Sequence, residues 1–175
     1  LYTTLEPCNH YGRTGPCTDA IIESGIKRVV VSLIDPDERV SGSGVEALRS
    51  AGIKVDVGQN AVEAGQQLTP YLHHRRTGNP YVLLKLAATL DGRIAAPDGS
   101  STWITGEEAR TDVHKLRAES DAICVGAGTI RNDDPRLTVR SINFVTDEDP
   151  RRIVIGEIPE GAQVEPPESW KGPLS

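Results

Sequence analysis

The densest chemistry of the 175-residue chain lies between Leu5 and Cys17, where each of two cysteines follows a proline. Cys17 stands where helix signals begin, and a helix N-terminus stabilises the thiolate form that binds metal. Two thiolates brought together by one loop supply half of a tetrahedral zinc site. Because Cys8 and Cys17 are farther apart than the common two-residue gap, the residues alone leave two readings equally open: a metal site, or a loop with two unpaired thiols.

A second candidate site is the glycine-rich stretch Gly126–Thr129, which follows an apolar run. Glycines at the carboxyl end of a strand let a nucleotide or phosphate approach the backbone closely. Residues 80–157 hold no Gly-x-Gly-x-x-Gly fingerprint of the dinucleotide-binding type. The glycines alone therefore favour an ordinary tight turn after a strand.

Composition narrows the classes of partner and compartment. The net charge is -6, from 19 Lys+Arg against 25 Asp+Glu, which disfavours a nucleic-acid binder that works by neutralising phosphates. The apolar runs are too short to cross a bilayer. An odd number of cysteines, 3, argues against a disulfide framework and favours a reducing, cytoplasmic compartment. The chain starts at Leu1 and contains no Met, so we expect an internal fragment.

The first half of the chain alternates strand and helix signals, which predicts a parallel sheet with right-handed crossovers. Arg28–Leu33 is continuously apolar, as expected of a strand buried on both faces. Asn60, with Glu63 at the capping-box position, predicts one longer helix that ends in the basic run 73–76. The other predicted elements are a strand at 2–5, a helix from Cys17 to Gly25, a helix over 45–51 and a strand at 53–57.

A helix stop and turn at 77–80 predict a domain boundary, with domains 1–78 and 79–175. Beyond it we expect a β segment at 81–88, an Asp-Gly turn at 91–92 and a buried strand at 122–126. A capping box at 105–108 predicts a helix with Ala109, Val113 and Leu116 facing inward. A further strand is expected at 152–155.

The stretch Leu5–Cys17 resembles the zinc-binding motif of the cytidine-deaminase superfamily, and its spacing resembles the bifunctional deaminase–reductase family of riboflavin biosynthesis. Four later stretches are similar, in order and spacing, to the reductase half of that family. They are Lys85–Arg93, Trp103–Gly106, Val125–Thr129 and Asp133–Arg140. The resemblance implies a cytidine-deaminase-like αβα domain followed by a truncated dihydrofolate-reductase-like α/β domain.

For the deaminase half, the resemblance implies that Cys8 and Cys17 are zinc ligands and that His10 contacts substrate. The third zinc ligand and the proton-shuttling glutamate of the family form a His-x-Glu motif that would lie upstream of Leu1. Glu6 precedes the Pro-Cys pair and is therefore not assigned as that acid/base. We expect the fragment alone to lack deaminase activity, and the alternative is a pseudo-deaminase scaffold attached to a working reductase.

For the reductase half, the resemblance implies NADPH as the reductant and a small phosphorylated pyrimidine as the substrate. Lys85 on the first strand is a candidate catalytic residue, whereas His114 and Lys115 fit a solvated helix face. The implied cofactor contacts are Ala87, Trp103, Thr129 and Asp133. The implied substrate contacts are Ser101, Arg117, Leu137 and Arg140. We also expect a homo-oligomer formed through the reductase domain. The net charge and the short apolar runs predict no nucleic-acid and no membrane partner.

Overall fold

The computed structural model describes residues 1–99, 104–140 and 149–164. The chain divides into two compact units, Leu1–Leu84 and Lys85–Ser175, and each unit is described by itself. The predicted domain bounds, 1–78 and 79–175, stay a prediction. Within the described ranges no helix is long and apolar enough to cross a membrane.

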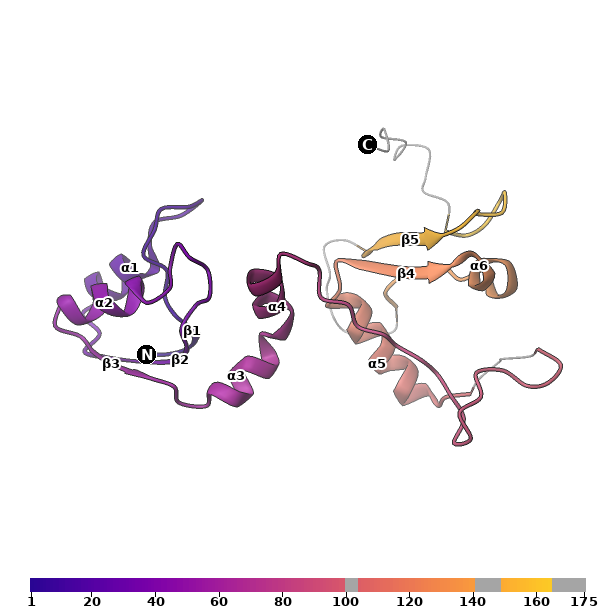
Figure 1. Cartoon of the computed structure of the whole chain (residues 1–175), viewed down its shortest axis with the longest axis horizontal. Coiled ribbons are helices and arrows are strands. Elements are labelled where there is room, and N and C mark those ends of the chain that lie inside the picture. The colour runs from indigo at the N-terminus through magenta and orange to yellow at the C-terminus, as the bar shows by residue number, and fades with distance from the viewer. Residues whose placement is uncertain (100–103, 141–148, 165–175) are drawn as a thin grey trace. The chain divides into compact units, whose positions relative to one another are not determined.

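The first unit is built on a three-stranded parallel sheet, as predicted (Figure 1). Its strands are β1 (Tyr2–Leu5), β2 (Arg28–Leu33) and β3 (Lys54–Val57), in the order β1-β2-β3. Parallel neighbours need a crossover, and the helices α1 (Cys17–Glu23) and α2 (Ser43–Ser50) provide the two connections. Both helices end before a glycine with positive φ, Gly25 and Gly52, as predicted.

The central strand β2 carries the core of this unit. Val29 and Val31 are 0% exposed and Val30 is 4% exposed, so the prediction of a strand buried on both faces is confirmed. Successive side chains of a strand point to opposite faces, so Val29 and Val31 share the face covered by α1 and α2. The cluster on that face consists of Ile21, Val29, Val31, Val45, Leu48, Ile53 and Val55.

The single long helix predicted after Asn60 is wrong. The structure has two helices, α3 (Ala61–Gln67) and α4 (Thr69–Thr77), and Asn60 makes no side-chain capping bond. The break comes from Pro70, which lacks the N–H that a continuous helix would direct to the carbonyl of Gln66. The Thr69 hydroxyl donates to that carbonyl instead, at 2.9 Å.

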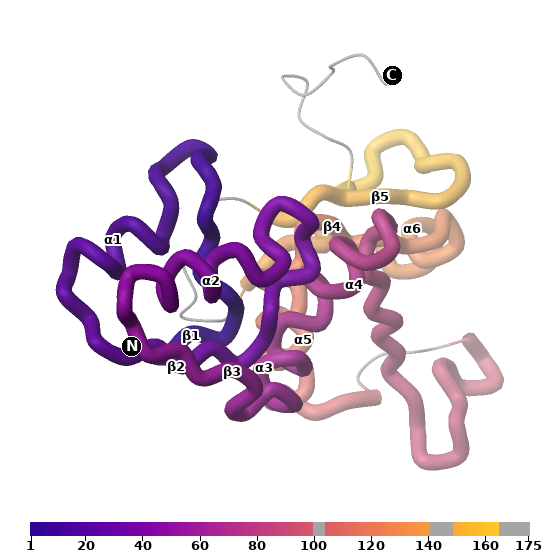
Figure 2. The backbone as a smooth tube through the Cα atoms, turned by 60° about the vertical axis from the view of Figure 1, so that its left-hand side comes forward, coloured from indigo at the N-terminus to yellow at the C-terminus, as the bar shows by residue number. Residues whose placement is uncertain are grey.

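The second unit contains α5 (Glu107–Ala118), β4 (Ala122–Gly126), α6 (Ala127–Asp133) and β5 (Arg151–Ile155). β4 and β5 pair in parallel, with Cys124 opposite Ile153 (Figure 2). The strand at 122–126 was predicted to be buried, and this is wrong: its residues alternate between exposed and half-buried, with Cys124 exposed. Within the described residues, the second unit has a small core cluster of Ile130, Leu137 and Val164.

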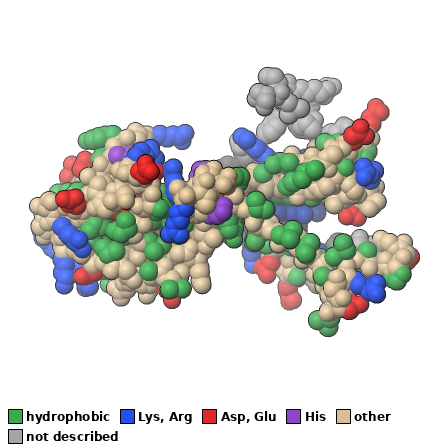
Figure 3. Space-filling view, in the orientation of Figure 1, with side chains coloured by type: hydrophobic (Ala, Val, Ile, Leu, Met, Phe, Trp, Pro, Cys, Tyr) green, Lys and Arg blue, Asp and Glu red, His purple; other side chains and the backbone are tan. Residues whose placement is uncertain are grey.

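Three further expectations for this half of the chain are corrected. Residues 81–88 form neither strand nor helix. Val82 and Leu84 are about four-fifths exposed because no strand within the described ranges pairs with this segment. Figure 3 shows hydrophobic side chains uncovered on this part of the surface. The predicted capping box is absent, since α5 starts from Gly106 with no side-chain cap. No residue of α5 is buried, so its expected inward face packs only loosely.

The Asp91-Gly92 turn is confirmed. Gly92 has positive φ, and its N–H donates to the carbonyl of Thr89 at 2.9 Å.

Candidate functional site

The two cysteines of the first unit meet at the start of α1. Cys17 is the first residue of the helix, and its backbone N–H donates to the Sγ of Cys8 at 3.4 Å. The pKa of the Cys17 thiol is raised, first by a hydrogen bond with the Cys8 side chain and then by partial burial. The two thiols are therefore within reach of each other, as the Pro-Cys pattern predicts, although both are free.

The loop between the cysteines is tied down at both ends. The N–H of Thr18 donates to the Cys8 carbonyl at 3.2 Å, and the fully buried Thr18 hydroxyl donates to Oδ1 of Asn9 at 2.9 Å. His10 is half-buried, and among the described residues its Nδ1 is a buried nitrogen without a hydrogen-bond partner. A buried nitrogen without a partner, in the loop between the two cysteines, is a group that a polar ligand could satisfy.

Glu6, two residues before Cys8, is an anchor and not an acid facing the loop. Its side chain is 4% exposed. Its Oε1 accepts the N–H groups of Gly44 at 2.9 Å and Val45 at 3.0 Å, and its Oε2 accepts those of Gly42 at 2.9 Å and Asp35 at 3.2 Å. The carboxylate thus takes up the free amides at the start of α2, which supports leaving it out of the acid/base role.

A polar network extends from this anchor to α4. The Tyr71 hydroxyl donates to the Asp35 carboxylate at 2.9 Å, and Arg75 pairs with Asp37 at 3.2 Å. Arg39 also bonds Asp37, and together these guanidiniums hold the pKa of Asp37 well below its usual range.

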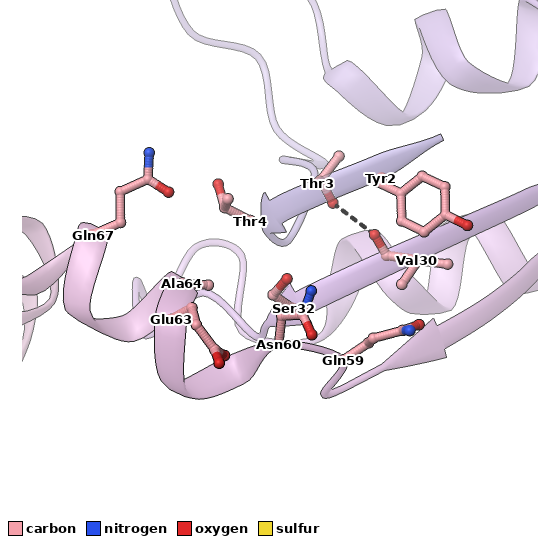
Figure 4. A pocket seen from close by; sticks show the side chains of 10 residues that line it. All are labelled: Tyr2, Thr3, Thr4, Val30, Ser32, Gln59, Asn60, Glu63, Ala64 and Gln67. Atoms are coloured by element: carbon pink, nitrogen blue, oxygen red, sulfur yellow. Dashed lines mark hydrogen bonds between the residues drawn. The ribbon is translucent and has the colours of Figure 1, made fainter.

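A separate pocket of about 340 Å³ lies on the other face of the sheet (Figure 4). It includes Val30 and Ser32 of β2, which alternate with the core-facing Val29 and Val31. Its remaining lining comes from Tyr2, Thr3, Thr4, Gln59, Asn60, Glu63, Ala64 and Gln67. No cysteine lines it, so the pocket and the thiol pair are different places.

In the second unit, predicted substrate contacts come together as a cationic cluster. The Arg117 Nη1 donates to the Thr138 carbonyl at 3.0 Å, and an Arg140 Nη1 donates to the Thr138 hydroxyl at 3.3 Å. Burial and the Arg140 charge lower the pKa of Arg117. Leu137, next in the chain to Thr138, is 4% exposed and has a positive φ of 53°. Two forked cations facing one region suit an anionic group such as phosphate.

His114 is a member of this cluster that sequence reasoning missed. Its Nδ1 accepts the backbone N–H of Arg140 at 3.1 Å, so it is no free surface residue. Burial, followed by the charges of Arg117 and Arg140, lowers the pKa of His114. The signal that could have found it is the i, i+3 spacing to Arg117, which places the two side chains on one helix face.

The other predicted residues of this unit are more scattered. Lys85 is exposed and Ala87 half-buried in the segment without regular structure. Thr129 and Asp133 are exposed residues of α6, which follows β4 directly. Ser101 and Trp103 lie outside the described residues.

Among the described residues, no group of three or more His, Cys, Asp or Glu side chains is arranged to hold a metal ion. The cysteine pair offers two soft donors, and a tetrahedral zinc ion needs two more ligands. The donor type therefore fits zinc, while the number of donors does not complete the site.

Family models match both halves of the chain. Residues 1–33 match the cytidine and deoxycytidylate deaminase zinc-binding region, and residues 80–163 match the RibD C-terminal domain. The riboflavin biosynthesis protein RibD of Aquifex aeolicus is 51% identical over 94% of this chain and 46% of its own length. The RibD of Escherichia coli K12 is 52% identical over 79% of this chain and 38% of its own length.

The chain belongs to the RibD family.

Solved structures agree with this assignment. RibD of Acinetobacter baumannii has a TM-score of 0.83 and 43% identity, covering 93% of this chain and 48% of its own. A diaminohydroxyphosphoribosylaminopyrimidine deaminase/5-amino-6-(5-phosphoribosylamino)uracil reductase of Thermotoga maritima has a TM-score of 0.79 and 44% identity, covering 87% and 42%. The chain thus spans about half the length of the RibD relatives it matches. The predicted family and the succession of a cytidine-deaminase-like and a dihydrofolate-reductase-like domain are confirmed.

Proposed function

We propose that the chain contributes to two sites of riboflavin biosynthesis. The first is a zinc-dependent site that hydrolytically deaminates a phosphoribosylamino-pyrimidinone, and the second is an NADPH-dependent site that reduces the ribosyl chain of the product to ribityl. The observation that carries the proposal is the Cys17 N–H on the Cys8 sulfur at the start of α1, within the region that matches the deaminase zinc-binding model.

In the deaminase half, Cys8 and Cys17 would hold the metal, which supplies a bound water of lowered pKa. The N–H of Cys17 donates to the sulfur of Cys8 at 3.4 Å, and Cys17 is itself the first residue of α1. His10, with its unpaired Nδ1, would contact the substrate. The 175 residues contain no His-x-Glu, so we expect no deamination by this chain alone.

A metal titration of a full-length protein that contains this sequence tests the cysteine assignment, because the described residues of this chain do not by themselves complete the ligand set. Cd²⁺ is a soft substitute for zinc, and its thiolate bonds absorb in the ultraviolet. Cys8→Ser and Cys17→Ser should each remove most of this absorption, while Cys124→Ser, the matched control in the other unit, should retain it. Equal absorption in all three variants would reject the site. The rival reading, a pseudo-deaminase scaffold, would be supported by a full-length relative of this sequence that binds no zinc and still reduces its substrate.

In the reductase half, Arg117 and Arg140 would bind the phosphate of the substrate, with Leu137 and Ser101 as further contacts. NADPH, which supplies the hydride, would lie near α6. Support comes from Gly126 and Gly128, where a Cβ would meet nothing within 4 Å, so the backbone is open to close approach. The residues assigned to the cofactor are Ala87, Trp103, Thr129 and Asp133, with Lys85 as the candidate catalytic residue.

Titration calorimetry on a full-length protein that contains this sequence separates the two ligands. Arg140→Ala should weaken binding of the phosphorylated substrate about ten- to a hundred-fold and leave NADPH binding nearly unchanged. Thr129→Val should do the opposite. Equal loss of both ligands in Arg140→Ala would make this arginine structural. The alternative is that Arg140 pairs with Asp133 or Asp134 and holds the loop; Asp134 bonds Gln163 at 2.9 Å, which supports the phosphate role over a pairing with that residue.

A cytoplasmic location and a homo-oligomer formed through the reductase domain complete the proposal. The three free cysteines support a reducing compartment.

A further inference from the structure

We propose that Glu6 and Gly44 are positioning residues that fix Cys8 for metal binding, although neither touches the metal. The inference rests on the proposed zinc site and adds the residues that aim one of its ligands. In structural terms, the start of α2 is the platform on which the Glu6–Pro7–Cys8 segment lies.

Glu6 is held in place by hydrogen bonds of both its backbone and its side chain. Its backbone N–H donates to the Leu33 carbonyl at 2.9 Å, which continues the β1–β2 ladder by one residue. Its buried carboxylate accepts four backbone N–H groups, three of them from the start of α2 and one from Asp35. A buried carboxylate is tolerated only when its oxygens are satisfied in this way, so the contact fixes the side chain and both partner segments together.

Gly44 lies very close to the Glu6–Pro7 backbone segment. A Cβ built at this position would overlap the carbonyl oxygen of Pro7 and would lie 3.3 Å from Cγ of Glu6. The φ of Gly44 is not of the positive kind, so the need for glycine is a need for space. Pro7 is buried, and its ring fixes its own φ. The position of the Pro7 carbonyl therefore sets the direction of the chain at Cys8.

The contacts of Glu6 and Gly44 place Cys8 relative to Cys17. Cys8 must present its sulfur to the same point as Cys17, whose place is set by the first turn of α1. Metal sites tolerate errors of only a few tenths of an ångström, so the ligands depend on fixed surroundings. Cys8 lies on a loop and lacks a helix of its own, and the Glu6–Gly44 contact supplies the rigidity.

Alkylation of individual cysteines tests the positioning without any metal. Cys8 is half-buried and Cys124 is exposed, so Cys124 in the same chain serves as the internal reference. The rate at Cys8 relative to Cys124 should rise about tenfold in Glu6→Gln, which keeps size but sets an NH₂ against amide donors, and likewise in Gly44→Ala. If Gly44→Ala does not fold, Glu6→Gln decides alone.

Two control variants separate positioning from a general loss of stability. Leu48→Ala leaves a cavity in the same helix, one turn beyond Gly44, and Gly65→Ala adds a methyl where only Leu33 Cδ1 is near, at 4.0 Å. At a temperature where all variants are folded, both should keep the wild-type ratio of Cys8 to Cys124. An unchanged ratio in Glu6→Gln and Gly44→Ala, or an equal rise in Leu48→Ala, would overturn the proposal.

Cd²⁺ titration of the same variants, made in a full-length protein that contains this sequence, separates the positioning role from the zinc site itself. We expect Glu6→Gln and Gly44→Ala to need about tenfold more Cd²⁺ than the wild type to reach the same thiolate absorption. The two control variants should need the same concentration as the wild type. Absorption that titrates equally in every variant would refute the positioning role and leave the zinc site intact. No thiolate absorption in the wild type would reject the zinc site, while the alkylation ratio would still judge the role of Glu6 and Gly44.

Discussion

The two units of this chain solve the same packing problem to different degrees. The first has three parallel strands and a core cluster of seven buried residues on one face of the sheet. The second, within the residues described, has two parallel strands and a cluster of three. A two-stranded sheet with half-buried faces is only marginally stable by itself. A third strand gives the sheet a central strand, which can be buried on both of its faces.

The difference shows how each candidate site is held. The cysteine pair lies beside a buried polar anchor, where Glu6 and Asp35 connect β1, α2 and α4. Among the described residues, the hydrogen bonds of the cationic cluster in the second unit join partly exposed groups, such as Arg140 with His114. We infer that the first site is rigid within this chain and that the second adjusts more easily.

The largest expected effect is on the core of the first unit. Leu48 is 0% exposed, so Leu48→Ala should lower the free energy of unfolding of this unit by about 2–5 kcal/mol. Hydrogen exchange should show the loss in β2 and β3 and leave β4 unchanged. Equal loss of protection in β4 would show that the units unfold together. Ile155→Ala, at a 70% exposed position, is the control and should change little.

A smaller effect tests whether α4 shares the stability of the first unit. Tyr71→Phe removes the hydroxyl that donates to Asp35 at 2.9 Å, and should cost about 1–2 kcal/mol, toward the lower range for a bond to a charged group. Denaturant unfolding followed by hydrogen exchange in α4 measures it. Tyr11→Phe is the matched control, since Tyr11 is 81% exposed. Equal stability of both variants would mean that α4 is not docked through this bond.

The sequence predicts the first unit far better than the second, for a physical reason. Its strand and helix signals are local: the apolar run of β2, and the glycines that end α1 and α2, need no distant partner to be recognised. The apolar residues at 81–88 and 122–126 carry a similar signal, but a strand requires a neighbour. Within the part of the chain that the structure describes, no strand pairs with the first segment and only β5 pairs with the second.

The sites follow the same division. Cys8 and Cys17 are predictable because proline, cysteine and a helix start are adjacent in the sequence. The anchoring of Glu6 by α2, 38 residues away at Gly44, leaves no local trace. The hydrogen bond from the Arg140 N–H to His114 joins residues 26 positions apart and leaves no local trace either. The sequence around His114 therefore predicts a solvated helix face.

A stabilising change in the first unit gives an effect of the opposite sign. Gly65 lies inside α3 without a positive φ, and an added methyl would make only ordinary contact with Leu33. Gly65→Ala should therefore raise the free energy of unfolding by about 0.5–1 kcal/mol through helix propensity. Thermal unfolding of the first unit measures the gain. A loss of stability would indicate that α3 is more tightly packed against β2 than its neighbours suggest.

The smallest expected effect uses pH to separate the units. In the second unit the pKa of His114 is lowered by burial and by Arg117 and Arg140, so the unfolded chain binds the proton more readily than the folded one. Stability contributed by neutral His114 is present above its unfolded pKa, about 6.5, and is lost as pH falls below that value and through the lower pKa of the folded state. Protonation of Nδ1 would also remove the acceptor for the Arg140 N–H.

In the first unit the pKa of Asp37 is lowered by Arg39 and Arg75. Its contribution is therefore present above the ordinary carboxylate value and is lost only as pH falls below about 3.9. Between pH 7.5 and 5.5 hydrogen exchange should thus reveal a weakening of α5 and β4, of less than about 1 kcal/mol because the group is partly exposed, with β2 unaffected. His114→Gln, which cannot titrate, should make the second unit insensitive to pH in this window. If β2 weakened in parallel, or if His114→Gln kept the pH dependence, the electrostatic distinction between the two units would be wrong.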